Sequence, residues 1–462
     1  MQPQPFQPTW ASLQRYRAPN WFRDAKFGIY LHWGVYSVVE RGEWHARNMY
    51  IQGHANYQRH LETYGHPSKF GYKDLIPLWK AERFDPDRLV QLFEDAGARY
   101  FTPCAVHHDN FDLWNSKHHR WNSVNMGPQK DIMKMWREAT LKTDMRFGAT
   151  THLERAYSWF NVNKNADTRG PLRGVPYDGA DPAYEEYYFE KHDDTDLRHP
   201  RNAPPSWRRA WADRIKDLID QHEIDLLYLD GAVPFQGDDD GAAGREVMAY
   251  HYNRSIERHG KLDSVMCVKK HDHHGVWMDG VATRDMERSR ADRILRSPWQ
   301  TDTSIGPWGY VAGAKYRDTI EIIHELIDIV SKNGNLLLNV PPKADGTLDE
   351  ATERILAEIG AWMRVNGEGL YGTRPWRVYG DEENAVRFVK KDRFLYAHFL
   401  RWPSGGAFQV RHLPRSARVR DVQMMGLDGS LEWTRDGDML SVKAPLEPPC
   451  EHAYALQIEL NR

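Results

Sequence analysis

The chain has few cysteines, no long apolar run and almost no excess of charge of either sign. Its three cysteines are too few and too scattered for a disulfide framework or a zinc knuckle. Lysine and arginine together number 62 and aspartate and glutamate 65, so the net charge of −3 gives no support for a nucleic-acid partner or an anionic membrane surface. No run approaches the length of about 18 apolar residues that a membrane span needs. The N-terminus lacks the basic region and apolar core of a signal peptide, so we expect a cytoplasmic protein, or a secreted or periplasmic one if a leader was removed.

A nucleotide-binding motif is also missing. No Gly-x-Gly-x-x-Gly or Walker-type loop follows any expected strand, so we expect no cofactor. The chain is instead rich in side chains that suit carbohydrate, with 18 Trp, 22 Tyr and 22 His. Aromatic faces stack on the C–H faces of sugars, while imidazoles and carboxylates hydrogen-bond hydroxyl groups. This composition is a weak indication of a sugar-binding protein.

Short apolar segments alternate with amphipathic ones over about the first 350 residues, which is typical of a parallel α/β architecture. Strands are expected at 27–34, 100–106, 147–151, 226–229, 264–268, 280–283 and 335–340. Helices are expected at 86–96, 206–222 and 317–331, with a final one opened by a capping box of Thr347 and Glu350 and ending near residue 365. We predict a (β/α)8-like, TIM-type barrel over residues 1–375.

Two other stretches differ from this pattern. Beyond residue 375 the segments 385–389, 394–398 and 408–410 alternate apolar and polar residues, which predicts an antiparallel β-sandwich over 376–462. Residues 161–205 form a long polar stretch, which would be either a roof over an active site or a tolerated surface insertion.

Polar side chains follow several of the expected strands directly. His32 ends the strand at 27–34, His107 and His108 follow 100–106, His152 follows 147–151, and Asp230 follows the apolar run 226–229. In parallel α/β barrels chemistry is built at the carboxyl ends of the strands. The alternative for Asp230 is a turn cap, because Asp-Gly is a common turn pair.

Five segments of the chain resemble, in order and spacing, the retaining α-L-fucosidases of glycoside hydrolase family 29. They are Trp21–Gly34, Gly42–Trp44, His107–Phe111, Tyr228–Gly231 and Ser331–Val340. The resemblance covers roughly residues 15–375, and the family's barrel followed by a C-terminal β-sandwich agrees with the fold predicted above. The chain departs from the family at Val106 and Asn110, where relatives often have lysine and glycine, and around residues 147–155.

The resemblance implies an exo-acting enzyme that removes terminal α-L-fucosyl residues from oligosaccharides or glycoconjugates by double displacement. Asp230 is then the nucleophile, and a second carboxyl group roughly 5–5.5 Å away serves as acid and base. We choose Glu287, twelve residues before Trp299, with Glu154 and Glu43 as substitutes. The alternative for Glu287 is an ordinary ion pair within a charged run. The arginine that relatives place before the acid/base has no clear match.

The resemblance also implies a set of sugar contacts. Hydroxyl binding is assigned to five residues, which are His32, Glu43, Trp44, His107 and His108. His152 is expected to take over a sugar contact, and Tyr228 stands where relatives often have Trp. Tyr30 and Trp308 are expected to form an apolar wall for the methyl group at C5 that distinguishes fucose from galactose.

Three rival hypotheses remain. The cluster His271-Asp272-His273-His274 would suit a metal ion, but its spacing is poor and no cysteine helps, so we predict no metal. A carbohydrate-binding barrel that has lost catalysis is the second, and a glycosidase for a related sugar such as galactose is the third. The expected partner is a fucosylated oligosaccharide or glycoconjugate, and the sequence leaves the oligomeric state open.

Overall fold

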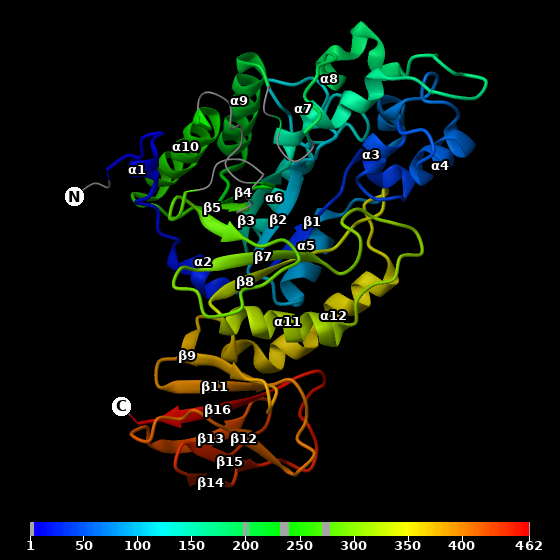
Figure 1. The fold of residues 1–462 in the computed structure, drawn as a ribbon. Helices are drawn as coiled ribbons and strands as arrows, with labels where there is room; N and C mark the ends of the chain where they lie inside the picture. Colours follow the sequence, from blue (N-terminus) through cyan, green and yellow to red (C-terminus); the bar gives the residue numbers. More distant parts are fainter. Residues whose placement is uncertain (1–3, 197–199, 201–202, 232–239, 270–277, 462) are drawn as a thin grey trace.

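The computed structural model describes residues 4–196, 200, 203–231, 240–269 and 278–461. Its larger part is a closed barrel of eight parallel strands in chain order, surrounded by helices (Figure 1). The barrel strands are β1 (Phe27–Leu31), β2 (Tyr100–Val106), β3 (Arg146–Thr151), β4 (Leu226–Leu229), β5 (Val265–Lys269), β6 (Thr283–Asp285), β7 (Trp299–Ser304) and β8 (Gly334–Asn339). The predicted barrel is therefore confirmed. Strand β6 begins where the predicted strand 280–283 was to end, and β7 was not predicted.

The long helices pack around the barrel. They are α5 (Pro86–Asp95), α6 (Ile132–Thr140), α9 (Pro205–His222), α10 (Ala242–His259), α11 (Thr319–Ser331) and α12 (Glu350–Asn366). Asp85 caps α5, since its side chain accepts a hydrogen bond from the Arg88 amide. The predicted capping box of α12 is wrong: Asp349 caps this helix, and the Thr347 hydroxyl donates to Asp345 instead.

Short elements fill the connections at the carboxyl ends of the strands. They are η1 (Val35–Val39), α3 (His45–Asn48), α4 (Ala55–Tyr64), η2 (Tyr72–Leu78), η3 (Leu153–Arg155), α7 (Ala156–Trp159), η4 (Phe160–Lys164), η5 (Asp178–Ala180), η6 (Pro182–Tyr184) and α8 (Glu185–Tyr188). Two more, α1 (Trp10–Leu13) and α2 (Asn20–Ala25), precede the barrel, and η7 (Gly367–Gly369) follows it. The polar stretch 161–205 thus contains η4, η5, η6 and α8.

The barrel interior is filled by alternate residues of its strands, because successive side chains of a strand point to opposite faces. Tyr30, Tyr100, Tyr228 and Cys267 belong to this interior cluster, and the Tyr100 hydroxyl crosses from β2 to donate to the Gln300 side chain of β7 at 3.0 Å. A Cβ on Gly28 would lie 2.5 Å from the Tyr100 ring, so this position has to be glycine for the ring to fit. The outward-facing residues belong to the larger core under the helices.

The C-terminal part consists of two antiparallel sheets, with strand orders β13-β16-β11-β10-β9 and β12-β15-β14. Their strands are β9 (Arg374–Asp381), β10 (Val386–Lys391), β11 (Phe394–Phe399), β12 (Ala407–Val410), β13 (Val419–Met424), β14 (Trp433–Asp436), β15 (Met439–Lys443) and β16 (Tyr454–Leu460). Residues of both sheets share one buried core, as the predicted sandwich requires. A division of the chain at residues 375 and 376 stays a prediction.

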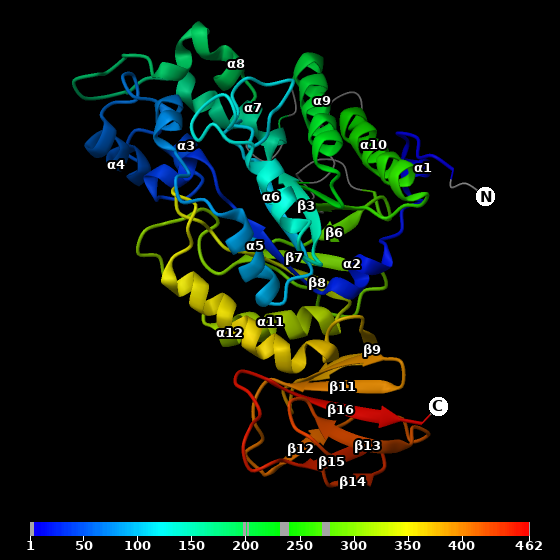
Figure 2. The same ribbon diagram turned by 180° about the vertical axis from the view of Figure 1, so that it is seen from behind.

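The two parts meet along α11 and α12, with the sheets on the far side of the barrel from α3, α4, α7 and α8 (Figure 2). Arg387 of β10 joins the parts by donating to Asp328 of α11 at 2.6 Å. Among the helices of the described residues, none has the length and apolar character to cross a membrane.

Candidate active site

The candidate site is built by the same alternation that fills the barrel. A residue two positions beyond an interior residue points the same way, so the last one of each strand reaches the mouth of the barrel. Asp230 follows Tyr228 in this manner on β4, and Lys269 follows Cys267 on β5. The other residues placed by this rule are His32 after β1, His152 after β3, Asp285 and Glu287 on and after β6, and Asp302 on β7.

Asp230 lies at the centre of the mouth and is almost fully buried. One of its oxygens, Oδ1, accepts a hydrogen bond from the Lys269 ammonium. The other, Oδ2, lies 3.0 Å from His152 Nδ1 and 3.8 Å from both His108 Nε2 and an Arg155 nitrogen. Burial opposes ionisation of this carboxyl, but Lys269, His152 and Arg155 outweigh it and hold the pKa of Asp230 well below its ordinary value. The group is therefore an anion at neutral pH.

Lys269 connects the carboxylates of the site, and the sequence reasoning missed it. Its Nζ bonds Asp230, donates to Glu287 Oε2 at 2.8 Å and lies 3.7 Å from Asp302. Burial would lower the pKa of this lysine, but the surrounding carboxylates raise it above the ordinary value, so the ammonium stays charged. The predicted strand stopped one residue short of Lys269, which left the orientation of the side chain undetermined.

Asp230 and Glu287 both contact the Lys269 ammonium nitrogen, so their carboxyl groups lie close together. Retaining glycosidases place their two carboxyl groups roughly 5–5.5 Å apart. The Glu287 side chain is 36% exposed, so it is open to solvent in a way that Asp230 is not. The proximity of the pair makes it the candidate for the two groups of a double displacement.

A second carboxyl pair, Asp285 and Asp302, lies below Lys269 inside the barrel. The two groups hydrogen-bond one another, which requires one of them to be protonated. Tyr228 donates its hydroxyl to Asp285 at 3.1 Å, and Gln300 donates its amide to the other oxygen at 2.8 Å. Burial raises the pKa of both aspartates; Asp302 raises that of Asp285 further, whereas Lys269 and the hydrogen bond with Asp285 act against the rise at Asp302. This pair was also missed, because β7 is too polar to be predicted as a strand.

Four imidazoles occupy the other side of the mouth. The ring centroids of His107 and His152 are 4.7 Å apart, and His32 lies 5.1 Å from His152. Burial lowers the pKa of His32, His107 and His108 well below the ordinary value, so these rings are neutral. Each neutral ring offers one donor and one acceptor.

The imidazole orientations are fixed by neighbouring groups. Asn339 of β8 bonds both the amide and Nδ1 of His32, each at 2.9 Å. His108 Nδ1 donates to the carbonyl of His152 at 2.6 Å, and the Tyr30 hydroxyl lies 2.8 Å from His152 Nε2. These bonds leave Nε2 of His32 and of His108 to face a ligand, whereas both nitrogens of His152 have partners, Tyr30 and Asp230.

The same groups have the spacing of metal ligands. His32, His107 and His152 form one set, and His108, His152 and Asp230 form another, with ligand atoms within 4.8 Å of one another in each. Nitrogen and oxygen donors of this kind suit zinc and related ions. The predicted metal candidate, His271–His274, lies outside the described residues.

The remaining predicted contacts lie around these rings. Glu43 Oε2 accepts the Gly309 amide at 2.8 Å, and burial raises the pKa of this carboxyl. Trp44 contacts His108 at a centroid distance of 6.3 Å, and the half-buried Trp308 lies 5.1 Å from His32. Tyr30 and Tyr228 belong to the interior cluster and are fully buried, and Tyr30 packs 6.0 Å from Trp308, so their sugar contacts stay predictions.

Glu154, the first substitute for the acid/base, is fully buried in the described structure. Neither of its side-chain oxygens has a hydrogen-bond partner among the described residues. Burial and the nearby Asp230 charge raise the pKa of Glu154 to about 8. It is a neutral carboxyl at pH 7, adjacent to the site and without access to solvent.

A parallel eight-stranded barrel that carries paired carboxylates and sugar-suited imidazoles at the carboxyl ends of its strands defines a glycoside hydrolase. Comparison with known proteins identifies its family. The α-L-fucosidase family model matches residues 1–368, and the model of the α-L-fucosidase C-terminal domain matches residues 381–459. The chain therefore belongs to the α-L-fucosidase family.

Individual relatives agree with this assignment over the whole chain. Tissue α-L-fucosidase of Homo sapiens is 29% identical over 469 residues, covering 99% of this chain and 92% of the relative. That of Rattus norvegicus is 28% identical, with coverages of 99% and 93%. The crystal structure of the Thermotoga maritima α-fucosidase in complex with fucose superposes with a TM-score of 0.77 at 26% identity, covering 98% of this chain and 100% of that one.

Proposed function

We propose that the protein is a retaining, exo-acting α-L-fucosidase in which Asp230 is the nucleophile and Glu287 the acid/base. The observation that carries this proposal is the shared contact of both carboxylates with the Lys269 ammonium. This contact supports the pairing because it keeps the two carboxyl groups next to one another, as double displacement requires. Membership of the α-L-fucosidase family supports the choice of sugar.

In the first step Asp230 attacks the anomeric carbon of a terminal fucosyl residue. The low pKa of Asp230 keeps it ionised and ready to form this bond. As the bond to the leaving oxygen breaks, Glu287 transfers its proton to that oxygen. The products of the step are a fucosyl ester of Asp230 and the released aglycone.

In the second step the ester is hydrolysed. Glu287, now an anion, takes a proton from water, and the water oxygen attacks the anomeric carbon while the bond to Asp230 breaks. Two inversions give fucose with its original anomeric configuration. Lys269 contacts both carboxylates throughout, so it holds them in register and offsets the negative charge that moves between them.

The sugar is bound by the side of the mouth that carries the neutral imidazoles. We assign hydroxyl binding to His32, His107, His108 and Glu43, with Trp44 beside them. Trp308 forms the apolar wall for the C5 methyl group. The buried Tyr30 acts as a positioning residue through its hydrogen bond to His152, and Tyr228 does so through Asp285.

Glu287 is preferred to Glu154 as the acid/base because its side chain is accessible to solvent. The acid/base must reach the leaving oxygen and later a water molecule. The Glu287 side chain is 36% exposed and lies next to Asp230 through Lys269, whereas both oxygens of Glu154 are buried. The raised pKa of Glu154 would suit an acid, and this makes it the specific alternative to test.

The first test replaces the nucleophile. With an aryl α-L-fucoside, kcat of Asp230→Gly should fall at least about 1,000-fold, because no other group can form the covalent intermediate. The circular dichroism spectrum should stay that of the folded protein. Turnover within tenfold of the wild type would remove Asp230 from this role.

The second test separates the two candidate acids. In Glu287→Ala, azide should restore turnover of an activated aryl fucoside and give fucosyl azide, because azide attacks the glycosyl-enzyme without base assistance. Glu154→Gln should retain its activity and show no response to azide. Rescue of the Glu154 variant, and none for Glu287, would exchange the assignments.

A substrate panel addresses the two rival functions. Aryl α-L-fucoside and aryl β-D-galactoside measured side by side distinguish a fucosidase from a galactosidase, and binding of fucose without turnover of either would indicate a barrel that has lost catalysis. Fucosylated oligosaccharides of different linkage then define the aglycone. Residence in the cytoplasm stays a prediction of the sequence alone, and the oligomeric state stays open.

A further inference from the structure

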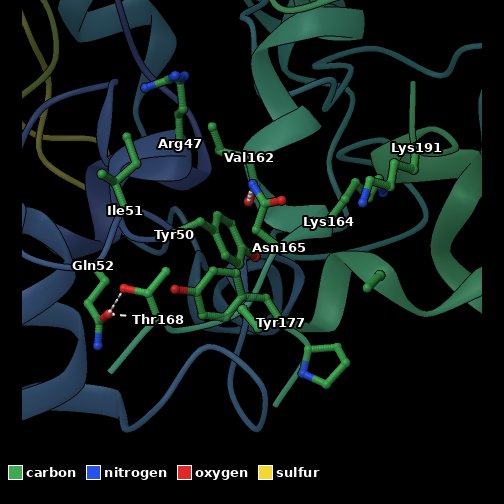
Figure 3. Close-up of a pocket in the computed structure, with 13 residues that line it drawn as sticks. Arg47, Tyr50, Ile51, Gln52, Val162, Lys164, Asn165, Thr168, Tyr177 and Lys191 are labelled. Carbon is green, nitrogen blue, oxygen red and sulfur yellow. Dashed lines mark hydrogen bonds between the residues drawn. The ribbon is translucent and has the colours of Figure 1, made fainter. Parts of the chain in front are cut away.

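Two features of the described structure have no part in the reaction as proposed. One is a pocket of about 700 Å³, lined by Tyr50 and Lys191 among others (Figure 3), and none of the candidate site residues is among its described walls. The other is the buried pair Asp285 and Asp302, which meets the site directly because Lys269 Nζ lies 3.7 Å from Asp302 Oδ2. The pair is therefore the feature whose charge can act on the reaction.

The Lys269 ammonium lies among carboxyl groups from several neighbouring strands. Burial opposes its charge, but these carboxyl groups outweigh burial and raise its pKa. In order of decreasing effect they are Asp230, Asp302, Glu287 and Asp285. Asp230 and Glu287 accept hydrogen bonds from Nζ and react with the substrate, whereas Asp302 lies within ion-pair distance of Nζ. The second strongest anion around the lysine is thus a group that takes part in neither bond.

The two aspartates share one proton, and the structure indicates that Asp285 holds it. Burial raises the pKa of Asp285 well above its ordinary value, and the adjacent Asp302 raises it further. At Asp302 burial acts in the same direction, but Lys269 and the hydrogen bond with Asp285 oppose it. The negative charge of the pair therefore lies on Asp302, the member that reaches Lys269.

Buried groups of the barrel interior fix Asp285. The Tyr228 hydroxyl donates to its Oδ1 at 3.1 Å, and the Gln300 amide donates to its Oδ2 at 2.8 Å. Gln300 in turn accepts the Tyr100 hydroxyl at 3.0 Å. Because each of these groups is buried and bonded, Asp285 has little freedom to turn. Asp302, which hydrogen-bonds Asp285, is thereby held in place below the ammonium.

The charges around the ammonium change during double displacement, except at this pair. Before the first step Asp230 is the anion and Glu287 carries a proton; in the glycosyl-enzyme Asp230 is an ester and Glu287 is the anion. The attraction on Lys269 therefore moves from one carboxyl group to the other. Asp302 keeps its charge in both states. A fixed third anion holds the ammonium between its two partners, where it would otherwise follow the moving charge.

We propose that Asp302 is a positioning residue of the reaction, whose charge keeps Lys269 between the nucleophile and the acid/base in both steps. Asp285 holds the proton that leaves this charge on Asp302. The proposal rests on the double displacement by Asp230 and Glu287 proposed above, and it adds a residue to that mechanism. Without the charge, Lys269 would bind Asp230 more tightly before the first step and Glu287 more tightly before the second. The nucleophile and then the base would be weakened.

The test compares two variants of nearly equal shape in the full-length enzyme. In Asp302→Asn any charge of the pair moves to Asp285, which the new amide hydrogen-bonds, so kcat/KM on an aryl α-L-fucoside should fall about 10- to 100-fold. In Asp285→Asn the new amide donates to the Asp302 carboxylate and the charge stays beside Lys269. The loss in this second variant should be about fivefold smaller or less.

The pH profile distinguishes an effect of charge from general damage. The acid/base must hold its proton for the first step, and a neighbouring anion opposes the loss of that proton. The alkaline limb of kcat/KM should therefore move to lower pH by about 0.5–1 pH unit in Asp302→Asn, and it should stay in place in Asp285→Asn. A variant that only loosens the barrel would lower the rate without moving this limb.

Asp217→Asn is the matched control. Asp217 is a buried aspartate of α9 that accepts the Trp114 indole at 3.0 Å, away from the mouth, so its variant should keep the wild-type kcat/KM and pH profile. In all three variants the circular dichroism spectrum and the Ki of fucose should stay those of the wild type, because the imidazoles are unchanged. If Asp302→Asn does not fold, Asp302→Ser removes the same charge with a smaller side chain and takes its place.

The outcomes separate this inference from the function beneath it. No turnover of the aryl fucoside by the wild type would overturn the proposed function and this inference with it. Normal wild-type turnover, with Asp302→Asn within about twofold of it and the alkaline limb unmoved, would overturn the positioning role alone. Equal losses in the two variants without movement of the limb would show that the pair only fills the barrel, and movement in Asp285→Asn alone would place the charge on the other aspartate. Either result overturns the role of Asp302.

Discussion

The mouth of the barrel has two halves of opposite character. The half formed by β1 and β2 presents His32, His107 and His108, imidazoles that burial keeps neutral. The half formed by β4 to β7 presents the Asp230–Lys269 ion pair, with Glu287 beside it, and the Asp285–Asp302 pair. The same barrel therefore holds a neutral surface and an ionic one within a few ångströms of each other.

The difference follows from what burial costs each kind of group. A buried imidazole avoids the cost of charge by losing its proton, and it keeps a donor and an acceptor. A buried carboxylate that must stay ionised needs a partner, and Lys269 supplies it. The neutral half thus suits the hydroxyls of a neutral sugar, and the ionic half suits a step in which charge moves.

The strongest way to break this comparison is to remove the cation of the ionic half. Lys269→Met leaves Asp230, Glu287 and Asp302 without their common partner, so stability should fall by about 3–5 kcal/mol and kcat on an aryl fucoside at least about 100-fold. Urea unfolding and steady-state kinetics measure the two effects. Activity close to the wild type in the folded variant would show that the carboxylates do not depend on this lysine.

A matched control exists elsewhere in the molecule. Lys332 is also buried and donates to a buried carboxylate, Asp328, at 2.8 Å, but this pair lies between the barrel and the C-terminal sheets. Lys332→Met should lose stability and keep its kcat.

A smaller effect is expected from the neutral half. In His107→Asn one neutral hydrogen-bonding ring is lost, so KM for an aryl fucoside should rise about tenfold while kcat and its pH profile change little. His251→Asn, in a buried histidine of α10 that bonds the Val265 carbonyl, controls for general damage. A shifted pH profile in the His107 variant would mean that this imidazole exchanges protons during the reaction.

The sequence predicted the neutral half better than the ionic one, for a structural reason. His32, His107, His108 and Asp230 follow apolar strands that are visible in the sequence. Strand β7 has the sequence Trp-Gln-Thr-Asp-Thr-Ser. Because polar side chains such as Gln300 hydrogen-bond inside the barrel, no apolar run marks this strand in the sequence.

The sequence analysis did not predict Lys269 as a site residue, for a related reason. Its strand was predicted to end at residue 268, and only the alternation from Val265 through Cys267 shows that the next side chain on this face is the lysine. Helix α10 was not predicted either, because its N-cap is Gly241 and no side chain caps it. Lys269, Asp285 and Asp302 come together only because the closed barrel places β5, β6 and β7 side by side, and no single segment of the sequence reveals this.

The mildest test concerns Glu154, a carboxyl on the neutral side. Its pKa is about 8 in the folded protein against an ordinary value of 4.5, so the folded state holds a proton that the unfolded state releases between these values. Stability should therefore fall as pH rises from about 4.5 to about 8, and Glu154→Gln should remove this loss. Thermal unfolding should show equal midpoints near pH 4.5 and a variant about 5 °C more stable at pH 9. Midpoints that stay equal at both pH values would place Glu154 in a wetter environment.

The alternation that delivers each reactive side chain also predicts which changes of the gene the enzyme can tolerate. An insertion or deletion of one residue within β4 or β5 would turn Asp230 or Lys269 toward the helices and abolish turnover, even if the barrel still closed. The connections after the strands, such as residues 165–177, lie outside the barrel strands and can lengthen, shorten or be exchanged without moving these groups. Natural variation and laboratory recombination should therefore alter the accepted aglycone through these loops while the chemistry of bond cleavage is inherited unchanged.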